Sequence, residues 1–263
     1  MFAVGLSYGQ DSLDYAWKKV RSYPIGQDEI WVVDVLENIY ISDKGLINKY
    51  DSSGVLWFSQ SIKSLGNTTQ LIPINSMKLI HFSEEQQTLC YFDNTLSSMN
   101  DCVDLTDQDI VSAELVCGSS QPNKIWVLDN LNSTLNLLSL DNLSQTQEVK
   151  NLRGVLNLDE VTQIKERYNR LYLLDKSKGV YVFDLYATLI EFIPEESIQQ
   201  IEAFENTLFT VRGNLLNVRS LITSDNFDVE LPIDNVSELG YRNQFFYFRS
   251  NGNVHKYELQ FSE

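Results

Sequence analysis

Six regularly spaced positions carry side chains able to form ion pairs or hydrogen bonds. They follow one another at intervals of 40, 46, 46, 37 and 37 residues. They are Asp43, Ser83, Asp129, Asp175, Arg212 and Arg249. If the chain closes into a ring, the last repeat adjoins the first, and opposite charges at short range attract each other. The pattern then predicts ion pairs of Asp43 with Arg249 and of Asp175 with Arg212. Six side chains that point into solvent are the alternative.

Three lysines lie one to three residues beyond two of these positions and suggest anion binding. With the two arginines they make a cationic cluster on an otherwise acidic chain, which a small anion or an acidic partner would occupy. The candidate binding residues are Lys44, Lys176, Lys178, Arg212 and Arg249. Lys-Gly and Lys-Ser pairs are also ordinary solvated turn sequences, so a purely structural role is the alternative.

Residue types used by common catalytic sites are sparse. The two histidines, His81 and His255, fall inside apolar strand-like runs, where a structural role is expected. The chain has no Ser nucleophile elbow, no phosphate-binding Gly loop and no Asp-x-Asp-x-Asp-Gly calcium loop. We therefore predict no catalytic residue, no cofactor and no metal-ligand set from motifs.

Short strands must position these residues. Runs of β-branched and aromatic residues recur every 37 to 46 residues, a period typical of the blades of a β-propeller. Their anchor positions are Ile39, Leu79, Ile125, Leu171, Leu208 and Phe245. In the first repeat, residues 29–33, 38–42, 46–50 and 55–58 predict four strands, a to d. The sequence thus predicts an all-β fold, a six-bladed β-propeller.

The two ends of the chain complement each other. The last repeat shows no fourth strand before Glu263, whereas residues 15–23 form a strand-like run without a blade of their own. We predict that this N-terminal strand pairs into the last blade and closes the ring, which leaves no long unpaired edge. Residues 11–263 are expected to form one domain, because no linker-like segment interrupts them.

Several turns resemble those of a known class of propellers. Residues 38–58 place Asp after the second strand and an aromatic-Asp pair after the third, followed by a Gly turn. The pair, or an apolar-Asp equivalent, recurs at Tyr50-Asp51, Phe92-Asp93, Leu140-Asp141 and Phe183-Asp184. In these features the chain resembles the NHL-repeat and TolB-like six-bladed propellers, although the Asn-His-Leu signature is absent. The resemblance implies a rigid disc that binds a protein or ligand; a minority of similar propellers are lactonases, lyases or glycosidases.

Propeller geometry sorts the turns by face. The b–c turns share a face with the d–a connections, so the candidate cationic residues would lie together there, and we predict that a protein partner or small ligand binds this face. Because each blade is covered by its neighbours, inner strands are expected to be apolar at consecutive positions. Outer strands are expected to be more polar.

The charge and the apolar runs exclude two classes of partner. The net charge of −16, from 20 basic and 36 acidic residues, disfavours binding to nucleic acid or anionic lipid. No run approaches the ~18 apolar residues of a transmembrane helix.

Residues 1–10 resemble the end of a secretory signal. Ser7-Tyr8-Gly9 places small residues at the two positions that a signal peptidase reads, and Gln10 would begin the mature chain. We therefore expect export to the periplasm or cell envelope of a bacterium. An ordinary cytoplasmic N-terminus is the alternative.

The three cysteines allow one disulfide. Cys90 and Cys102 lie symmetrically about Leu96, so a hairpin centred there would place them opposite each other and leave Cys117 as the odd thiol. Three buried free thiols are the alternative.

Two functions are compatible with these features. The one we expect is a non-catalytic exported propeller that serves as a protein or ligand binding platform, with a partly apolar face and a central channel without convergent titratable groups. The alternative is a metal-assisted hydrolase or lactonase, in which carboxylate and amide side chains from several inner strands meet at the channel mouth. Candidate residues for the second function are Asp28, Asp109, Glu160 and Asp234.

Overall fold

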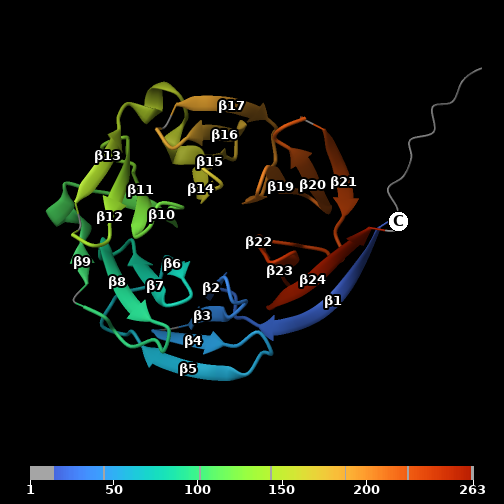
Figure 1. The fold of residues 1–263 in the computed structure, drawn as a ribbon, viewed down its shortest axis with the longest axis horizontal. Coiled ribbons are helices and arrows are strands. Elements are labelled where there is room, and N and C mark those ends of the chain that lie inside the picture. Colours follow the sequence, from blue (N-terminus) through green and yellow to red (C-terminus); the bar gives the residue numbers. More distant parts are fainter. Residues whose placement is uncertain are drawn as a thin grey trace, which may run out of the picture.

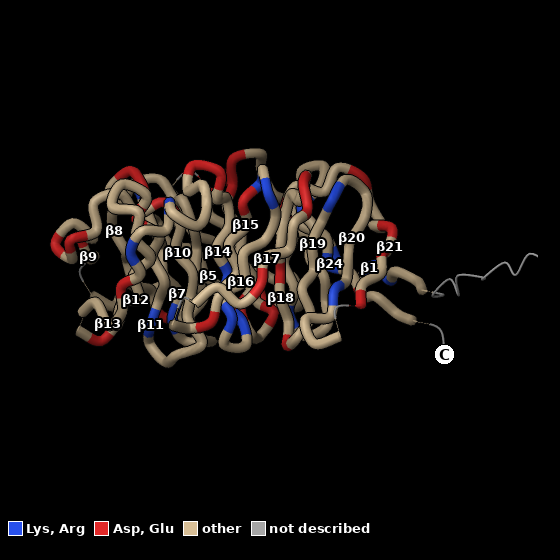
Figure 2. Tube along the Cα trace, turned by 90° about the horizontal axis from the view of Figure 1, so that it is seen from above, with Lys and Arg blue, Asp and Glu red and all other residues tan. Residues whose placement is uncertain are grey.

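The chain forms a ring of six four-stranded antiparallel sheets (Figure 1). A computed structural model describes residues 15–43, 45–100, 102–142, 144–186, 188–223 and 225–261. In each sheet, or blade, the first strand lies nearest the ring axis and the fourth lies at the rim, and the molecule seen edge-on is a flat disc (Figure 2). The predicted six-bladed β-propeller is confirmed, while the signal expected in residues 1–10 lies outside the described residues.

The first five blades each use four consecutive strands. Blade 1 contains β2 (Ile30–Val33), β3 (Ile39–Asp43), β4 (Leu46–Tyr50) and β5 (Leu56–Ser61). Blade 2 contains β6 (Gln70–Asn75), β7 (Lys78–Ser83), β8 (Thr88–Asp93) and β9 (Val103–Asp104). Blade 3 contains β10 (Ala113–Gly118), β11 (Lys124–Asp129), β12 (Thr134–Ser139) and β13 (Gln145–Val149). Blade 4 contains β14 (Val161–Arg167), β15 (Arg170–Asp175), β16 (Gly179–Asp184) and β17 (Leu189–Pro194). Blade 5 contains β18 (Gln200–Phe204), β19 (Thr207–Arg212), β20 (Leu215–Ser220) and β21 (Asn226–Glu230).

Short 3₁₀ helices occupy two of the d–a connections. Between blades 2 and 3 lies η1 (Leu105–Gln108), and between blades 3 and 4 lie η2 (Leu152–Gly154) and η3 (Leu158–Glu160). No helix in the described residues has the length and apolar character that crossing a bilayer would require.

Blade 6 joins the two ends of the chain. It contains β22 (Glu238–Arg242), β23 (Phe245–Ser250), β24 (Asn253–Phe261) and, at the rim, β1 (Tyr15–Pro24). β1 runs antiparallel to β24, with Tyr15 opposite Phe261 and Pro24 opposite Asn253. Closure of the ring by the N-terminal strand is thus confirmed.

β1 also bonds to the blades on both sides of blade 6. The indole Nε1 of Trp17 donates to the carbonyl oxygen of Glu230 in blade 5 at 2.8 Å. The guanidinium of Arg21 donates to the carbonyl oxygen of Ser53 in blade 1. The ring of Trp17 packs edge-on against Phe246, with ring centroids 5.3 Å apart, an arrangement favoured between aromatic rings. One strand therefore links three blades.

The core lies between neighbouring blades. Residues 125–129 of β11 and 171–175 of β15 are buried at every position, as expected for strands covered on both faces. Trp126 of blade 3 packs in the same apolar cluster as Leu171 and Leu173 of blade 4. The outer strands are mostly polar, but β5 and β17 depart from that expectation.

Asp residues at the ends of third strands fold the c–d turns. Asp93 accepts from the backbone N–H groups of Thr95 and Ser97 at 2.8 and 2.9 Å. Asp184 does the same for Tyr186 and Thr188 at 2.9 and 2.8 Å. These are Asx-type turns, in which a short carboxylate replaces a backbone acceptor. The aromatic-Asp pairs thus join a buried ring in the sheet to a self-bonded turn.

Cys90 and Cys102 form a disulfide across the c–d hairpin of blade 2. Cys90 lies in β8, and Cys102 directly precedes β9, with 4.3 Å between the two Cα atoms. Cys117 is the buried free thiol. The predicted pairing is confirmed, and the alternative of three free thiols is wrong.

Candidate functional site

Three of the six repeated positions at the ends of the second strands, Asp129, Arg212 and Arg249, hold d–a connections in place. The carboxylate of Asp129 accepts from the backbone N–H of Val111 at 2.8 Å. Arg212 pairs with Glu195 in the connection that enters its blade. Neither predicted ion pair, Asp43 with Arg249 or Asp175 with Arg212, occurs within 4 Å between described residues, because both arginines take other partners.

Arg249 serves the connection that closes the ring. Its guanidinium donates to the carbonyl oxygens of Gly26 at 2.7 Å, Gln27 at 2.5 Å and Glu29 at 2.8 Å. It also pairs with Glu238 in its own blade. Arg249 lines a hollow of about 490 Å³, yet most of its five N–H donors are already used. It is therefore a poor anion ligand.

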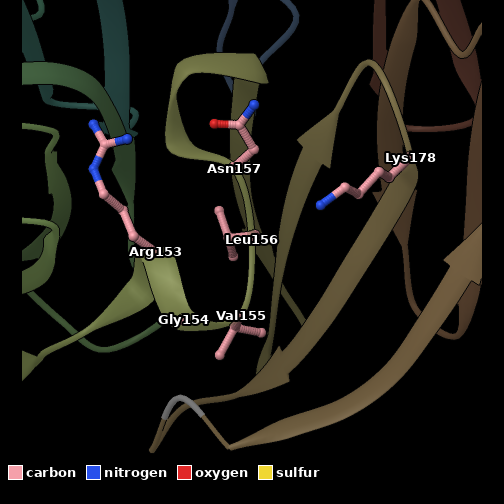
Figure 3. Close-up of a pocket in the computed structure, with 6 residues that line it drawn as sticks. All are labelled: Arg153, Gly154, Val155, Leu156, Asn157 and Lys178. Atoms are coloured by element: carbon pink, nitrogen blue, oxygen red, sulfur yellow. The ribbon is translucent and has the colours of Figure 1, made fainter.

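The predicted lysines have different surroundings. Lys44 lies outside the described residues. Lys176 and Lys178 are exposed in the β15–β16 turn, on the b–c face as expected. Lys178 and Arg153 approach a hollow of about 280 Å³ from opposite sides (Figure 3). Arg153 is held there by Asp159 at 2.9 Å. Anion binding on this face remains a prediction that rests on Lys176 and Lys178.

The residues expected for a metal-assisted hydrolase do not converge. Among the described residues, no group of three or more His, Cys, Asp or Glu side chains is placed to hold a metal ion. Asp28, Asp109, Glu160 and Asp234 lie in four different d–a connections. His81 is fully buried, and His255 shares a hydrogen bond of 2.7 Å with the hydroxyl of Ser22. Both histidines lie within a sheet.

Charged side chains of three inner strands meet near the ring axis. This axial cluster consists of Lys165 and Arg167 in β14, Glu202 in β18 and Arg242 in β22. The Nζ of Lys165 lies 2.8 Å from one oxygen of Glu202, and the Nε of Arg167 lies 3.7 Å from the other. The expectation of a channel without convergent titratable groups is therefore wrong. The group is mainly cationic, which also differs from the carboxylate-rich site of a metal enzyme.

The cluster controls the charge of Glu202. Burial alone would raise the pKa of this carboxyl group, but Lys165, Arg167 and Arg242 outweigh burial and lower its pKa to about 2. Burial and, next, the positive charge of Arg167 lower the pKa of Arg242 to about 10. Glu202 is thus ionised at neutral pH and faces three cations.

The outer strand of blade 1 is a second notable surface. Val55, Leu56 and Trp57 are half or more exposed, at 56, 50 and 56%, and Phe58 follows at 36%. The other five outer strands, β1, β9, β13, β17 and β21, each contain charged residues, whereas β5 has none. Charged side chains are a common way to protect an exposed sheet edge from pairing. β5 lacks this protection.

A β-bulge presents Trp57 to solvent. Lys49 lies opposite Phe58 and Tyr50 lies opposite Leu56, so Trp57 is the extra residue. Blades 3 and 4 have the same bulge at Thr146 and Ile190. In blade 3 the hydroxyl of Thr146 bonds to the carbonyl oxygen of Leu137 at 3.0 Å. A residue at the bulge can therefore be polar, and the bulge alone does not explain why residue 57 is a tryptophan.

Sequence reasoning missed both surfaces. The axial cluster lies on the first strands of the blades, and the sequences of these strands differ from blade to blade. The repeat pattern therefore gives no sign that Lys165 and Arg242 lie close together. The signal for β5 was visible, because residues 55–62 contain no charge, but an apolar run alone does not distinguish a buried strand from an exposed one.

The comparisons with known proteins agree on the fold. No family model matches the chain, and no curated protein sequence matches it. Among solved structures, the Pan2 WD40 domain of Neurospora crassa is 10% identical to this chain, with a TM-score of 0.64. The match covers 94% of this chain and 86% of the Pan2 chain. A streptogramin B lyase is 12% identical with a TM-score of 0.62, covering 95% and 88%. BamB from Moraxella catarrhalis is 11% identical with a TM-score of 0.56, covering 92% and 98%. The chain is similar to these proteins in fold, and the fold is that of a β-propeller.

Proposed function

We propose that this protein is a non-catalytic, exported β-propeller of the bacterial cell envelope that binds a partner protein along β5. The observation that supports this most strongly is the uncharged, exposed β5 strand with Trp57 at its bulge. Exposed apolar surface of this kind is typical of protein interaction sites, and Trp is among the residues that contribute most to binding.

The partner is expected to add a strand to blade 1. β5 pairs with β4 along one edge and presents its other edge at the rim (Figure 1). An extended segment of a partner can pair with such an edge, where backbone hydrogen bonds give affinity and side-chain contacts give specificity. A second copy of the chain is a poor occupant, because two molecules of net charge −16 repel each other. In the edge-on view of Figure 2, acidic positions are prominent along the upper set of turns.

The experiment compares two equivalent bulge positions. Trp57→Ser removes the proposed anchor, and Ile190→Ser, which is 53% exposed at the matching site of blade 4, is the control. A partner purified with the wild-type protein should bind W57S about thirtyfold more weakly or worse, as for a typical anchor residue, and I190S unchanged. Binding should also slow hydrogen exchange of residues 55–61. Protection elsewhere, or equal affinity of W57S and wild type, would refute the β5 site.

The disulfide supports export, since such bonds persist mainly in oxidising compartments. Mass spectrometry of the protein from its own cells, with thiols blocked before lysis, tests this directly. We expect a chain that begins at Gln10, with Cys90 and Cys102 bonded. A chain that begins at Met1 with three blocked thiols would show that it stays in the cytoplasm.

A further inference from the structure

We propose that the axial cluster binds an oxyanion, a carboxylate or phosphate group, held between the guanidinium groups of Arg167 and Arg242. This site is independent of the β5 surface. It lies on the inner strands of blades 4, 5 and 6, which are nearest the ring axis (Figure 1). We expect its ligand to enter along that axis.

Two arginines of the axial cluster have unused hydrogen-bonding capacity. Arg242 makes a single side-chain hydrogen bond among the described residues, from Nε to the carbonyl oxygen of Val33 at 3.3 Å, and it has no carboxylate within 4 Å there. The Nε of Arg167 is buried without a hydrogen-bond partner. Buried donors are normally paired, so each exception calls for a ligand or water.

The local charge of the axial cluster is positive. Lys165, Arg167 and Arg242 surround one carboxylate, Glu202, which is only 4% exposed. Two other buried acids nearby are turned toward neutral donors. Asp34 accepts from Asn38 Nδ2 at 2.8 Å and from the hydroxyl of Tyr40 at 3.1 Å.

Glu166, the second of these acids, faces blade 3. It accepts from the hydroxyl of Ser119 at 2.5 Å and from the indole of Trp126 at 2.6 Å. Glu202 therefore accepts a hydrogen bond from Lys165 and forms an ion pair with Arg167, while Arg242 has no carboxylate within 4 Å among the described residues.

The axial cluster is accessible from solvent. The side chains of Lys165 and Arg167 are each 25% exposed, so solvent reaches the cluster even though Glu202 is covered. A small oxyanion could approach the same groups. Planar guanidinium groups bind carboxylate and phosphate oxygens in pairs of parallel hydrogen bonds, and an anion between Arg167 and Arg242 would relieve the repulsion of two like charges.

Isothermal titration with inorganic phosphate and with acetate, against chloride at equal ionic strength, tests the proposal. We expect phosphate, acetate or both to bind the wild-type protein, and the preferred probe identifies the group. Arg242→Gln should weaken binding at least tenfold, while Lys18→Gln, which removes one exposed positive charge on the rim strand β1, should leave it unchanged. Glu202→Gln should strengthen binding severalfold, because it removes the internal competitor.

Absence of binding at millimolar probe concentration would overturn the proposal, and so would equal affinities of R242Q and wild type. If R242Q fails to fold by circular dichroism, Arg167→Gln takes its place with the same expectation. Weaker binding by a folded E202Q would also contradict the site, since Glu202 would then be helping the anion rather than competing with it.

Discussion

His81 is a polar side chain that the fold buries without a hydrogen bond among the described residues. The ring is completely buried in β7, and neither ring nitrogen has a hydrogen-bond partner among the described residues. Burial lowers the pKa of His81 to about 4, because a charged imidazole is poorly solvated there. The neutral ring behaves as an apolar core residue. At a pH below its ordinary pKa of 6.5, it becomes protonated when the chain unfolds.

The pH dependence of stability follows from this shift. Between pH 6.5 and about 4 the unfolded chain binds a proton at His81 and the native chain does not. Lowering the pH across this range therefore lowers the free energy of unfolding, by up to about 3 kcal/mol. We expect His81→Leu to remove this part of the slope and to leave stability at pH 7 equal or higher. Urea unfolding at pH 7, 6, 5 and 4 measures it.

His255→Leu is the contrasting variant, since it loses the hydrogen bond to Ser22 and should be less stable than wild type at pH 7 by about 1 kcal/mol. Parallel slopes for H81L and wild type would contradict the assignment.

Single residues also mark the limit of sequence reasoning about the site. The spacing correctly found that positions such as Asp129, Arg212 and Arg249 are repeated, but it assigned the arginines the wrong partners. Arg249 binds backbone carbonyl oxygens, which every residue has and no sequence pattern distinguishes. The charges of the axial cluster come together only through the ring, from three blades: Arg167 and Glu202 are 35 residues apart in sequence, and Glu202 and Arg242 are 40 apart.

At the scale of elements, the middle strands were the most predictable. β4 spans residues 46–50 as expected, because turn residues bound it on both sides. The first and last strands of blade 1 were less well placed: 29–33 became Ile30–Val33, and 55–58 became Leu56–Ser61. Rim strands are half exposed, so their ends depend on pairing rather than on an apolar boundary.

The c–d hairpin of blade 2 depends on its disulfide. β9 has only two residues, and the bond between Cys90 and Cys102 closes a loop of 12 residues. For a loop of this size the chain-entropy model gives about 3 kcal/mol of stabilisation. We expect the double variant Cys90→Ser/Cys102→Ser to lose about that much in urea unfolding and to become insensitive to dithiothreitol.

Cys117 provides the control. Burial, with a smaller effect of Glu166, raises the pKa of its thiol to about 12, so it should not react with a thiol reagent in the native protein. One thiol should react after denaturation, and three after denaturation with reduction. Cys117→Ala should keep the dithiothreitol sensitivity, and its loss would contradict the assigned disulfide.

For the whole molecule, stability depends on the closing strand. Trp17 contacts Phe246 and Phe248 with ring centroids 5.3 and 5.5 Å apart and bonds to blade 5. Trp17→Ala should lower the free energy of unfolding by about 3 kcal/mol, as is typical for a large aromatic residue. Because β1 links three blades, the loss should appear as a shift of one cooperative transition in calorimetry rather than as a separate early one.

Lys18→Ala is the matched control one residue away. Lys18 pairs with Glu258 at 3.4 Å, but its side chain is 64% exposed, and such pairs contribute at most about 1 kcal/mol. Equal effects of W17A and K18A would show that closure does not depend on the aromatic contact.

Closure by β1 also sets an order of events during synthesis. Among the strands of the propeller, β1 is synthesised before the others, yet its partner β24 ends at residue 261, so the earliest of these strands is the last to dock. Contacts between such distant segments form slowly, because a long loop must close first. Until then the nascent chain exposes Trp17 at one end and an unfinished blade at the other, which makes this interval its most aggregation-prone stage.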